Sequence, residues 1–317
     1  MSEAHGLLLV DKPTAMTSHD VVAAVRRLLK TRAVGHAGTL DPLATGLMVL
    51  LLGEGTKLSD YLLNGDKSYL VRVQFGIETD TWDVDGEVLR QEPVSVTPQK
   101  IRDAVHQLSG DLDLPVPAFS AIKQKGKKLY ELAREGKTVD APVRPMRFYG
   151  VAIDDMGRDW VDVSLSCSKG SYIRSWAVAL GALLGCPATV KTLRRLASQP
   201  YSVDRALPLV ELQTGSLADQ PAAEALSGCG SAFVSMAEVL PHWRALTVSG
   251  KDQRLLLNGQ ISHDLWRRLI CEQKTANQTD TAIGIKVMSG DDGRLLSLLE
   301  ARPFKGLKIK RVFKSLP

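Results

Sequence analysis

The stretch of this chain that decides its interpretation runs from Gly35 to Gly46, reads GHAGTLDPLATG, and leads directly into the apolar run Leu47–Leu52. It places one carboxylate, Asp41, among glycine-bearing turns and immediately before a proline. A prolyl ring disfavours the helical region for the preceding residue, so Asp41 is expected in an extended or turn conformation. The stretch predicts an acid side chain on a constrained loop that is backed by a buried element. The alternative is an ordinary turn or N-cap aspartate, since Asp-Pro pairs often open turns.

The composition is that of an ordinary globular protein, with 44% hydrophobic and 24% charged residues in 317. A net charge of +5 slightly favours a polyanionic partner. The four cysteines are scattered, with no CxxC pair and no metal-ligand spacing. We therefore expect no metal site, and reduced thiols in a cytoplasmic protein. There is no secretory signal pattern, and Leu47–Leu52 is too short to cross a bilayer, so no membrane association is expected.

Helix signals occur at three places. Ser18 is a suitable N-cap for a helix over 19–30, and Thr97-Pro98 opens a second helix. A third pattern runs from Ile173 to Leu184 and is closed by Gly185.

Strand signals alternate with these helices. Tyr69–Phe75 and Val161–Leu165 alternate apolar and polar residues, as half-buried strands do. From this arrangement we expect Tyr69 and Arg174 at strand ends or element edges, where functional side chains are common.

The chain is predicted to divide near residue 240, into a catalytic domain over 1–240 and a small β-rich domain over 241–317. The Ala-, Gly- and Ser-rich stretch Gln213–Ser231 is expected to be a surface loop or a short helix between them. Four strand-like runs follow, separated at one point by the turn-prone segment Ser289–Gly293: Ala245–Val248, Ala282–Val287, Leu295–Glu300 and Leu307–Phe313.

Gly35–Gly46 resembles the signature GH(A/T)G(T/A)LDPLATG of the TruB family of bacterial tRNA pseudouridine-55 synthases. Further segments match that family's motifs in the family's order: Asp11–Ser18, Asp66–Tyr69, Thr79–Asp83, Ser168–Arg174 and Leu193–Arg195. One departure is Ala15, which stands where the family has glycine. It bears on the local turn and not on the chemistry.

The resemblance implies an α+β fold, in which a mixed, largely antiparallel sheet with flanking helices precedes a C-terminal RNA-contacting domain of the PUA type. It also implies isomerisation of uridine 55 in the T loop of tRNA, by glycosidic bond cleavage, base rotation and rejoining through C5. This reaction needs no redox step and no group donor, so no cofactor is expected. Asp41 would be the essential carboxylate, and its attack on the sugar, attack on the base or abstraction of a proton all remain open.

The resemblance also assigns roles around Asp41. Arg174 would be its counter-ion, Tyr69 would stack on the target base, and Tyr172 and Leu193 would line the uridine pocket. His36 would brace the stack vacated by the extruded base. Each residue has a plain alternative: Arg174 as a surface residue of a helix, His36 as a structural histidine, and the others as core packing. Asp83 matches a family position near the site and is given a supporting role.

Five lysines are candidates for phosphate contact: Lys57, Lys123, Lys125, Lys308 and Lys310. The alternative for each is a solvated charged surface. The expected partner is the T arm of tRNA, with no obligatory protein partner. Two rival functions stay open, an RNA-guided or differently targeted synthase and a non-catalytic RNA-binding or tRNA-folding module.

Overall fold

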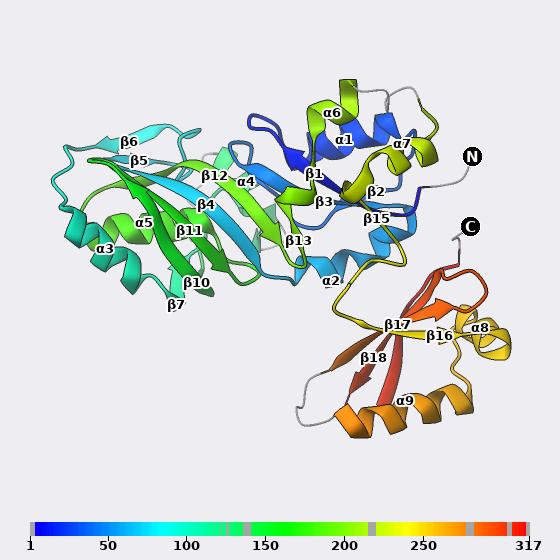
Figure 1. The fold of residues 1–317 in the computed structure, drawn as a ribbon. Coiled ribbons are helices and arrows are strands. Elements are labelled where there is room, and N and C mark those ends of the chain that lie inside the picture. The colour runs from blue at the N-terminus through cyan, green and yellow to red at the C-terminus, as the bar shows by residue number, and fades with distance from the viewer. Residues whose placement is uncertain are drawn as a thin grey trace.

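The computed structural model describes residues 4–120, 122–124, 127–135, 141–214, 220–276, 282–302 and 306–314. Its main feature is an 11-stranded sheet with the order β14-β1-β3-β12-β4-β11-β10-β7, to which β13, β15 and β2 are joined through β12, β1 and β3 (Figure 1). The pairs β1–β14 and β3–β12 are parallel, and the other pairs are antiparallel. The predicted α+β class with a mixed, largely antiparallel sheet is therefore confirmed.

The strands of this sheet are β1 (Gly6–Lys12), β2 (Val34–His36), β3 (Thr45–Leu52), β4 (Lys67–Phe75), β7 (Gly110–Pro115), β10 (Val143–Met156), β11 (Trp160–Cys167), β12 (Ala188–Ser198), β13 (Tyr201–Ser202), β14 (Leu207–Pro208) and β15 (Phe233–Ser235). Two small hairpins accompany it, formed by β5 (Ile77–Thr79) with β6 (Val88–Gln91) and by β8 (Lys123–Gln124) with β9 (Lys127–Lys128). The helices before residue 240 are α1 (Ser18–Leu28), α2 (Ser59–Leu63), α3 (Pro98–Gln107), α4 (Leu129–Arg134), α5 (Ile173–Leu184), α6 (Leu209–Thr214) and α7 (Ala222–Gly228). Short 3-10 turns lie at η1 (Gly53–Leu58), η2 (Val203–Arg205) and η3 (Gly230–Ala232).

The two alternating segments form neighbouring strands at the centre of the sheet. In β4 the side chains of Val71, Val73 and Phe75 are buried, and in β11 those of Val161 and Val163. Alternation with a period of two puts these residues on one face of the sheet. Helix α5 packs on that sheet and on α3, and its Trp176 donates from Nε1 to the Leu108 carbonyl at 2.9 Å.

Two of the predicted helices begin or end where the sequence indicates. Thr97 caps α3 by accepting from the amide of Lys100, and Gly185 ends α5 with a φ of 63°. The cap of α1 differs from the prediction. The N-cap is Thr17, which forms a capping box with Asp20, whereas Ser18 is the first helical residue and its hydroxyl turns to Leu40.

The register at the centre of the sheet brings three motif residues together. Arg195 of β12 lies opposite Gly46 of β3 on one side and opposite Tyr69 of β4 on the other. Segments that are far apart in the sequence thus meet at the point where the chain enters β3 from the loop carrying Asp41.

The C-terminal part forms a second sheet with the order β16-β17-β18-β19. Its elements are β16 (Arg244–Val248), α8 (Gly250–Leu257), α9 (His263–Ala276), β17 (Ile283–Ser289), β18 (Leu295–Arg302) and β19 (Gly306–Val312). The predicted strands and the hairpin after Ser289 are present. The helices α8 and α9 were not predicted, so this part is less purely β than the sequence indicated.

The second sheet is packed against the rest of the molecule beside α2 (Figure 1). Leu295, Leu298 and Phe313 are buried in the core of the large sheet, whereas their neighbours Leu296 and Leu299 lie in a separate cluster with α8 and α9. Neighbouring residues of β18 are thus buried in two different hydrophobic cores. Within the described residues, no helix is both long and apolar enough to cross a bilayer.

Candidate active site

The loop between β2 and β3 carries Asp41. Its two ends are fixed, because β2 pairs with the far end of β3 and the chain returns through Gly46 to the start of β3. Gly46 has a φ of 99°, and a Cβ there would lie 2.3 Å from the Arg195 carbonyl oxygen. Only glycine permits this approach to β12. The Asp41 side chain is about one-third exposed, with a relative accessibility of 33%, so a ligand can reach it.

Arg195 of β12 holds the loop through hydrogen bonds to its backbone. Its side chain is 1% exposed, and it donates to the carbonyls of Leu47 at 2.7 Å, Gly38 at 3.1 Å and Thr39 at 3.3 Å. A guanidinium offers donors in a fixed planar arrangement, so one side chain orients three backbone groups on both sides of Asp41.

Ser18 and Lys12 hold the residues next to Asp41. The Ser18 hydroxyl accepts from the Leu40 amide at 2.8 Å and donates to the Leu40 carbonyl at 3.0 Å. The fully buried Lys12 donates from Nζ to the carbonyls of Pro42 at 3.1 Å, Met16 at 2.6 Å and Pro13 at 2.8 Å. Burial lowers the pKa of Lys12 to about 8, although the nearby Asp41 charge opposes that change.

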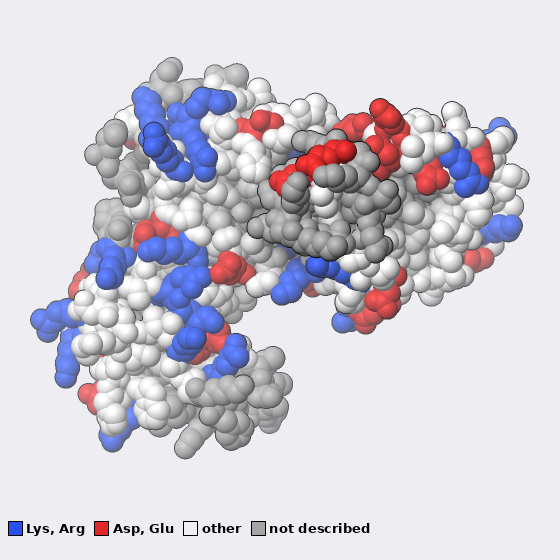
Figure 2. Space-filling view, turned by 180° about the vertical axis from the view of Figure 1, so that it is seen from behind, with Lys and Arg blue, Asp and Glu red and all other residues white. Residues whose placement is uncertain are grey.

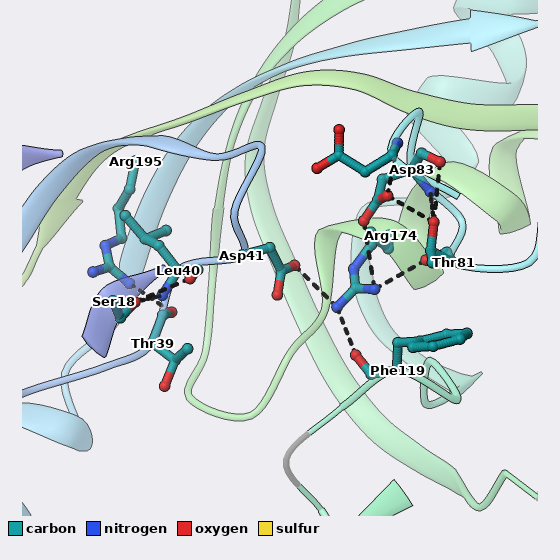
Figure 3. Close-up of polar contacts among 10 residues, drawn as sticks. Ser18, Thr39, Leu40, Asp41, Thr81, Asp83, Phe119, Arg174 and Arg195 are labelled. Atoms are coloured by element: carbon teal, nitrogen blue, oxygen red, sulfur yellow. Dashed lines mark hydrogen bonds and ion pairs between the residues drawn. The ribbon is translucent and has the colours of Figure 1, made fainter. Parts of the chain in front are cut away.

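Arg174 joins Asp41 to a second carboxylate. Its Nη2 lies 2.9 Å from Asp41 Oδ2, and its Nη1 lies 3.6 Å from Asp83 Oδ2. The guanidinium also donates to the carbonyls of Thr81 at 2.9 Å and Phe119 at 3.0 Å. Figure 3 shows Arg174 between Asp41 on one side and Thr81 and Asp83 on the other. With a relative accessibility of 5%, the arginine is held in one position and presents one edge to Asp41.

Asp83 is buried behind the arginine. It accepts from the Thr81 hydroxyl at 2.7 Å and from the Asp85 amide at 3.2 Å. Burial raises the pKa of Asp83, and the Thr81 hydrogen bond and the Arg174 charge counteract part of that rise. The cluster therefore couples two carboxylates through one cation, with only Asp41 substantially open to solvent.

Two tyrosines lie within electrostatic range of Asp41. Burial raises the pKa of both Tyr69 and Tyr172, and the Asp41 charge adds to both increases. Tyr172 is the N-cap residue of α5, two positions before Arg174. Tyr69 lies inside β4 between β11 and β12, so its predicted place at a strand end was wrong. A position inside the sheet holds the ring more rigidly than a loop would.

His36 and Leu193 complete the set of predicted residues. His36 is half-buried, its ring packs edge-on against His19 with 5.9 Å between centroids, and burial lowers its pKa. Its Nδ1 has no hydrogen-bond partner among the described residues. Leu193 is buried on β12, two residues before Arg195.

Comparison with known proteins shows to which protein family this chain belongs. Residues 26–173 match the model of the N-terminal domain of the TruB family of pseudouridylate synthases. A protein of Bdellovibrio bacteriovorus named tRNA pseudouridine synthase B is 45% identical, over 99% of this chain and 98% of that protein. The chain belongs to the TruB family.

Other relatives agree with this membership. Proteins of the same name from Alkaliphilus oremlandii and Salmonella typhimurium are 40% and 42% identical, over 80% and 67% of this chain and 82% and 68% of theirs. Among solved structures, an H/ACA RNP bound to a substrate RNA containing 2'-deoxyuridine has a TM-score of 0.64 at 19% identity, covering 99% of this chain and 86% of that one. That likeness concerns the fold alone. As a member of this family, the protein is a pseudouridine synthase.

The predicted RNA-contact lysines differ in their surroundings. Lys57 contacts Glu54 at 2.6 Å and the Val312 carbonyl at 3.3 Å, and Lys310 contacts Glu300 at 3.0 Å. Lys308 is exposed on β19 and has no ion pair among the described residues. Lys123 lies in β8, although its side chain is outside the described part, and Lys125 lies outside the described residues.

Sequence reasoning missed the residues that shape the Asp41 loop. Lys12 and Arg195 were recognised only as letters of motifs, without a role, and Ser18 was predicted to be a helix cap and not a contact of the loop. The signal that could have found Arg195 and Lys12 is the presence of long basic side chains in strand patterns that are otherwise buried. The carbonyl partners of Arg195, and Pro42 as a partner of Lys12, come from a distant segment and are not visible in a local pattern.

Proposed function

We propose that this TruB-family protein isomerises uridine 55 in the T loop of tRNA to pseudouridine. The single observation that carries the proposal is the partly exposed Asp41 carboxylate. Arg174 forms an ion pair with it, and the buried Arg195 holds the loop that carries it. The relatives named tRNA pseudouridine synthase B support tRNA as the substrate.

The chemistry follows from this arrangement. The reaction breaks the N1–C1′ bond, turns the detached uracil and forms a C5–C1′ bond. C5 then gives up its proton and N1 gains one, so atoms and electrons balance without a co-reactant. Asp41 acts as a carboxylate, and the ion pair with Arg174 holds it in one geometry. The loop contacts fix the carboxylate before the substrate arrives, and such preorganisation avoids a cost during the reaction.

The surrounding side chains hold the extruded nucleoside. Tyr69 stacks on the uracil, and Tyr172 and Leu193 bound the pocket. His36 braces the RNA stack that the target base has left. Extruding a base costs a few kcal/mol, and these contacts offset that cost.

We place the remaining RNA contacts on the C-terminal sheet. Lys308 has an exposed ammonium on β19, whereas Lys310 and Lys57 are already engaged by acids. Residues 241–317 are proposed as an RNA-contacting domain of the PUA type, and tRNA as the partner, with no protein partner required. A cytoplasmic location fits this substrate.

The proposal is tested with purified protein and an unmodified tRNA transcript. Site-specific chemical mapping should find pseudouridine at position 55 and nowhere else, and a transcript with cytidine at that position should remain unmodified. Modification at another uridine, or activity only after a guide RNA is added, would contradict it.

A further inference from the structure

The exposed surface of α1 carries an unusual concentration of positive charge. Between Asp20 and Asp41 the chain has no acidic residue, but it contains Arg26, Arg27, Lys30 and Arg32. Lys and Arg gather over the α1 end of the molecule at the upper left of Figure 2. Many other surface cations are neutralised by nearby carboxylates in the pairs Arg72–Asp162, Arg90–Glu92, Arg194–Asp11 and Arg311–Asp60.

Three of the four cations near the end of α1 are free. Arg27, Lys30 and Arg32 have no ion pair or side-chain hydrogen bond within the described part of the chain. Arg26 is different, since its Nη2 donates to the Val34 carbonyl at 2.7 Å and so ties the helix to β2. The three free cations therefore form a positively charged surface that is open to a ligand, whereas Arg26 also holds α1 against β2.

The residues form one stripe along the helix. His19, Ala23, Arg26 and Arg27 are spaced at intervals of three and four, which puts them on one face of α1, and Lys30 lies two residues beyond the last helical residue, Leu28. All except Ala23 are exposed. With a rise of about 1.5 Å per residue, the helical part of the stripe from His19 to Arg27 is about 12 Å long.

The conformation of Lys30 is an independent indication. Lys30 follows the C-cap Leu29 and has a φ of 48°, in the left-handed region. Glycine is the residue that adopts this conformation without steric cost after a helix, and a side chain with a Cβ does so at a cost. The sequence thus keeps a lysine at a position where glycine would fit the backbone better.

The stripe is continuous with the active site. It begins at His19, whose ring packs against His36. Its middle is tied through Arg26 to Val34, two residues before His36 in β2. Asp41 follows His36 by five residues. A polymer that binds at Asp41 and extends past His36 would therefore lie against α1.

We propose that this face of α1, here called the α1 stripe (His19, Arg26, Arg27 and Lys30, with Arg32 beyond its end), binds the phosphate backbone of the substrate RNA beside the target nucleotide. The inference rests on the proposed function, because an RNA substrate at Asp41 defines what lies next to His36. The cations from Arg26 to Arg32 have no acidic residue between them in the sequence, which suits an evenly charged polyanion. About 12 Å corresponds to roughly three to four nucleotides of one strand of a duplex, at about 3.4 Å each.

The first test removes two free charges. Arg27→Gln/Lys30→Gln is compared with the parent and with the control Lys100→Gln/Arg102→Gln, which removes two exposed charges from α3. We expect the stripe variant to raise KM about tenfold with kcat within about twofold, and to reduce the slope of log affinity against log salt by about 1.4–1.8. The control should match the parent in all three. If the stripe variant also matches the control, the inference is overturned.

The second test separates RNA contact from helix stability. Lys30→Gly relieves the left-handed backbone, so the melting temperature should rise or stay level while KM increases about threefold or more. A cation that merely complements the helix C-terminus would give an unchanged KM, and that result would reject the stripe.

Failure of the proposed function is distinguishable from failure of this inference. If the parent forms no pseudouridine at position 55, the proposed function fails. If the parent forms it and the salt slopes of parent and stripe variant coincide, only the α1 stripe fails.

Discussion

At the scale of single residues, Arg174 fixes the orientation of the Asp41 side chain. It is a buried cation between two carboxylates, and its two terminal nitrogens also donate to two backbone carbonyls. Leaving a buried charge without its partner costs about 3–5 kcal/mol, so the three charges stabilise one another only as a set. The consequence is that Asp41 is presented in one orientation with one oxygen already engaged.

Tyr69 offers a residue-scale prediction that separates stacking from proton transfer. Tyr69→Phe keeps the ring, so binding should stay close to that of the parent, with only a modest loss of rate. Tyr69→Leu removes the aromatic face and should cost about 1–3 kcal/mol in kcat/KM. Steady-state kinetics on tRNA measure both. If Phe lowers turnover as much as Leu does, the hydroxyl takes part in the reaction and stacking is not the role.

His36 predicts how stability depends on pH. Burial lowers its pKa below the ordinary value of 6.5, so just below that pH the unfolded chain binds a proton that the folded protein does not. The contribution to stability is complete above about pH 6.5 and is lost as the pH falls below it. His36→Gln should therefore lose less melting temperature between about pH 7.5 and about pH 5.5 than the parent does. His19→Gln, at an exposed neighbour, is the control, and equal losses in parent and His36→Gln would rule out this contribution.

At the scale of elements, the loop between β2 and β3 is shaped by side chains from elsewhere. Lys12 lies on β1, Ser18 on α1 and Arg195 on β12. All three form hydrogen bonds with backbone groups of the loop. Backbone groups have fixed positions relative to Asp41, so three separate elements define where the carboxylate stands. This explains why motifs that are distant in the sequence belong to one site.

Adjacent hydroxyls at the start of α1 should have different effects. Thr17→Ala removes a helix cap and should cost about 1 kcal/mol of stability with kcat unchanged. Ser18→Ala leaves the amide and carbonyl of Leu40 without their buried partner, which should cost about 1–3 kcal/mol and also reduce kcat, because Leu40 precedes Asp41. Chemical denaturation and kinetics on the two variants provide the comparison. Equal kcat values would show that Ser18 does not position the loop.

The elements also show how far sequence patterns reach. The ends of α5 and the start of α3 were predictable, because capping and termination depend on neighbouring residues. Ser18 was assigned as a cap because the pattern could not reveal its contact with Leu40, 22 positions away. The position of Tyr69 inside β4 was missed for a similar reason, since strand pairing depends on partners that lie about a hundred residues along the chain. The helices α8 and α9 lie between the first two predicted strands of the C-terminal part, where no helix was predicted.

At the scale of the whole molecule, the C-terminal sheet is joined to the part that holds the large sheet by an ion pair and by apolar contacts. Arg311 contacts Asp60 at 2.9 Å and the Lys57 carbonyl at 3.2 Å, and Phe313 is buried in the core of the large sheet. Tyr61 packs edge-on against Trp243, with 5.2 Å between centroids. The sequence separated the two parts by composition, but it could not show that residues of the last strands complete the core of the first part.

The two lysines of β19 should differ in RNA binding. Lys308 is exposed and free of an ion pair among the described residues, whereas Lys310 is held by Glu300. Lys308→Gln should reduce the slope of log affinity against log salt by about 0.7–0.9, as expected for one lost phosphate contact. Lys310→Gln should change the slope much less. Equal slopes in the parent and in Lys308→Gln would mean that this lysine is only a solvated edge residue.

The central claim is that Asp41 is the reacting carboxylate, and the most direct measurement is turnover by Asp41→Asn. The amide keeps the shape of the side chain and removes its charge, while RNA binding depends on many phosphate and stacking contacts. We predict no measurable pseudouridine at position 55 of tRNA, with tRNA affinity within a few-fold of the parent. Turnover at about a hundredth of the parent rate or more would contradict the claim. An equal loss of binding would assign Asp41 a structural role instead.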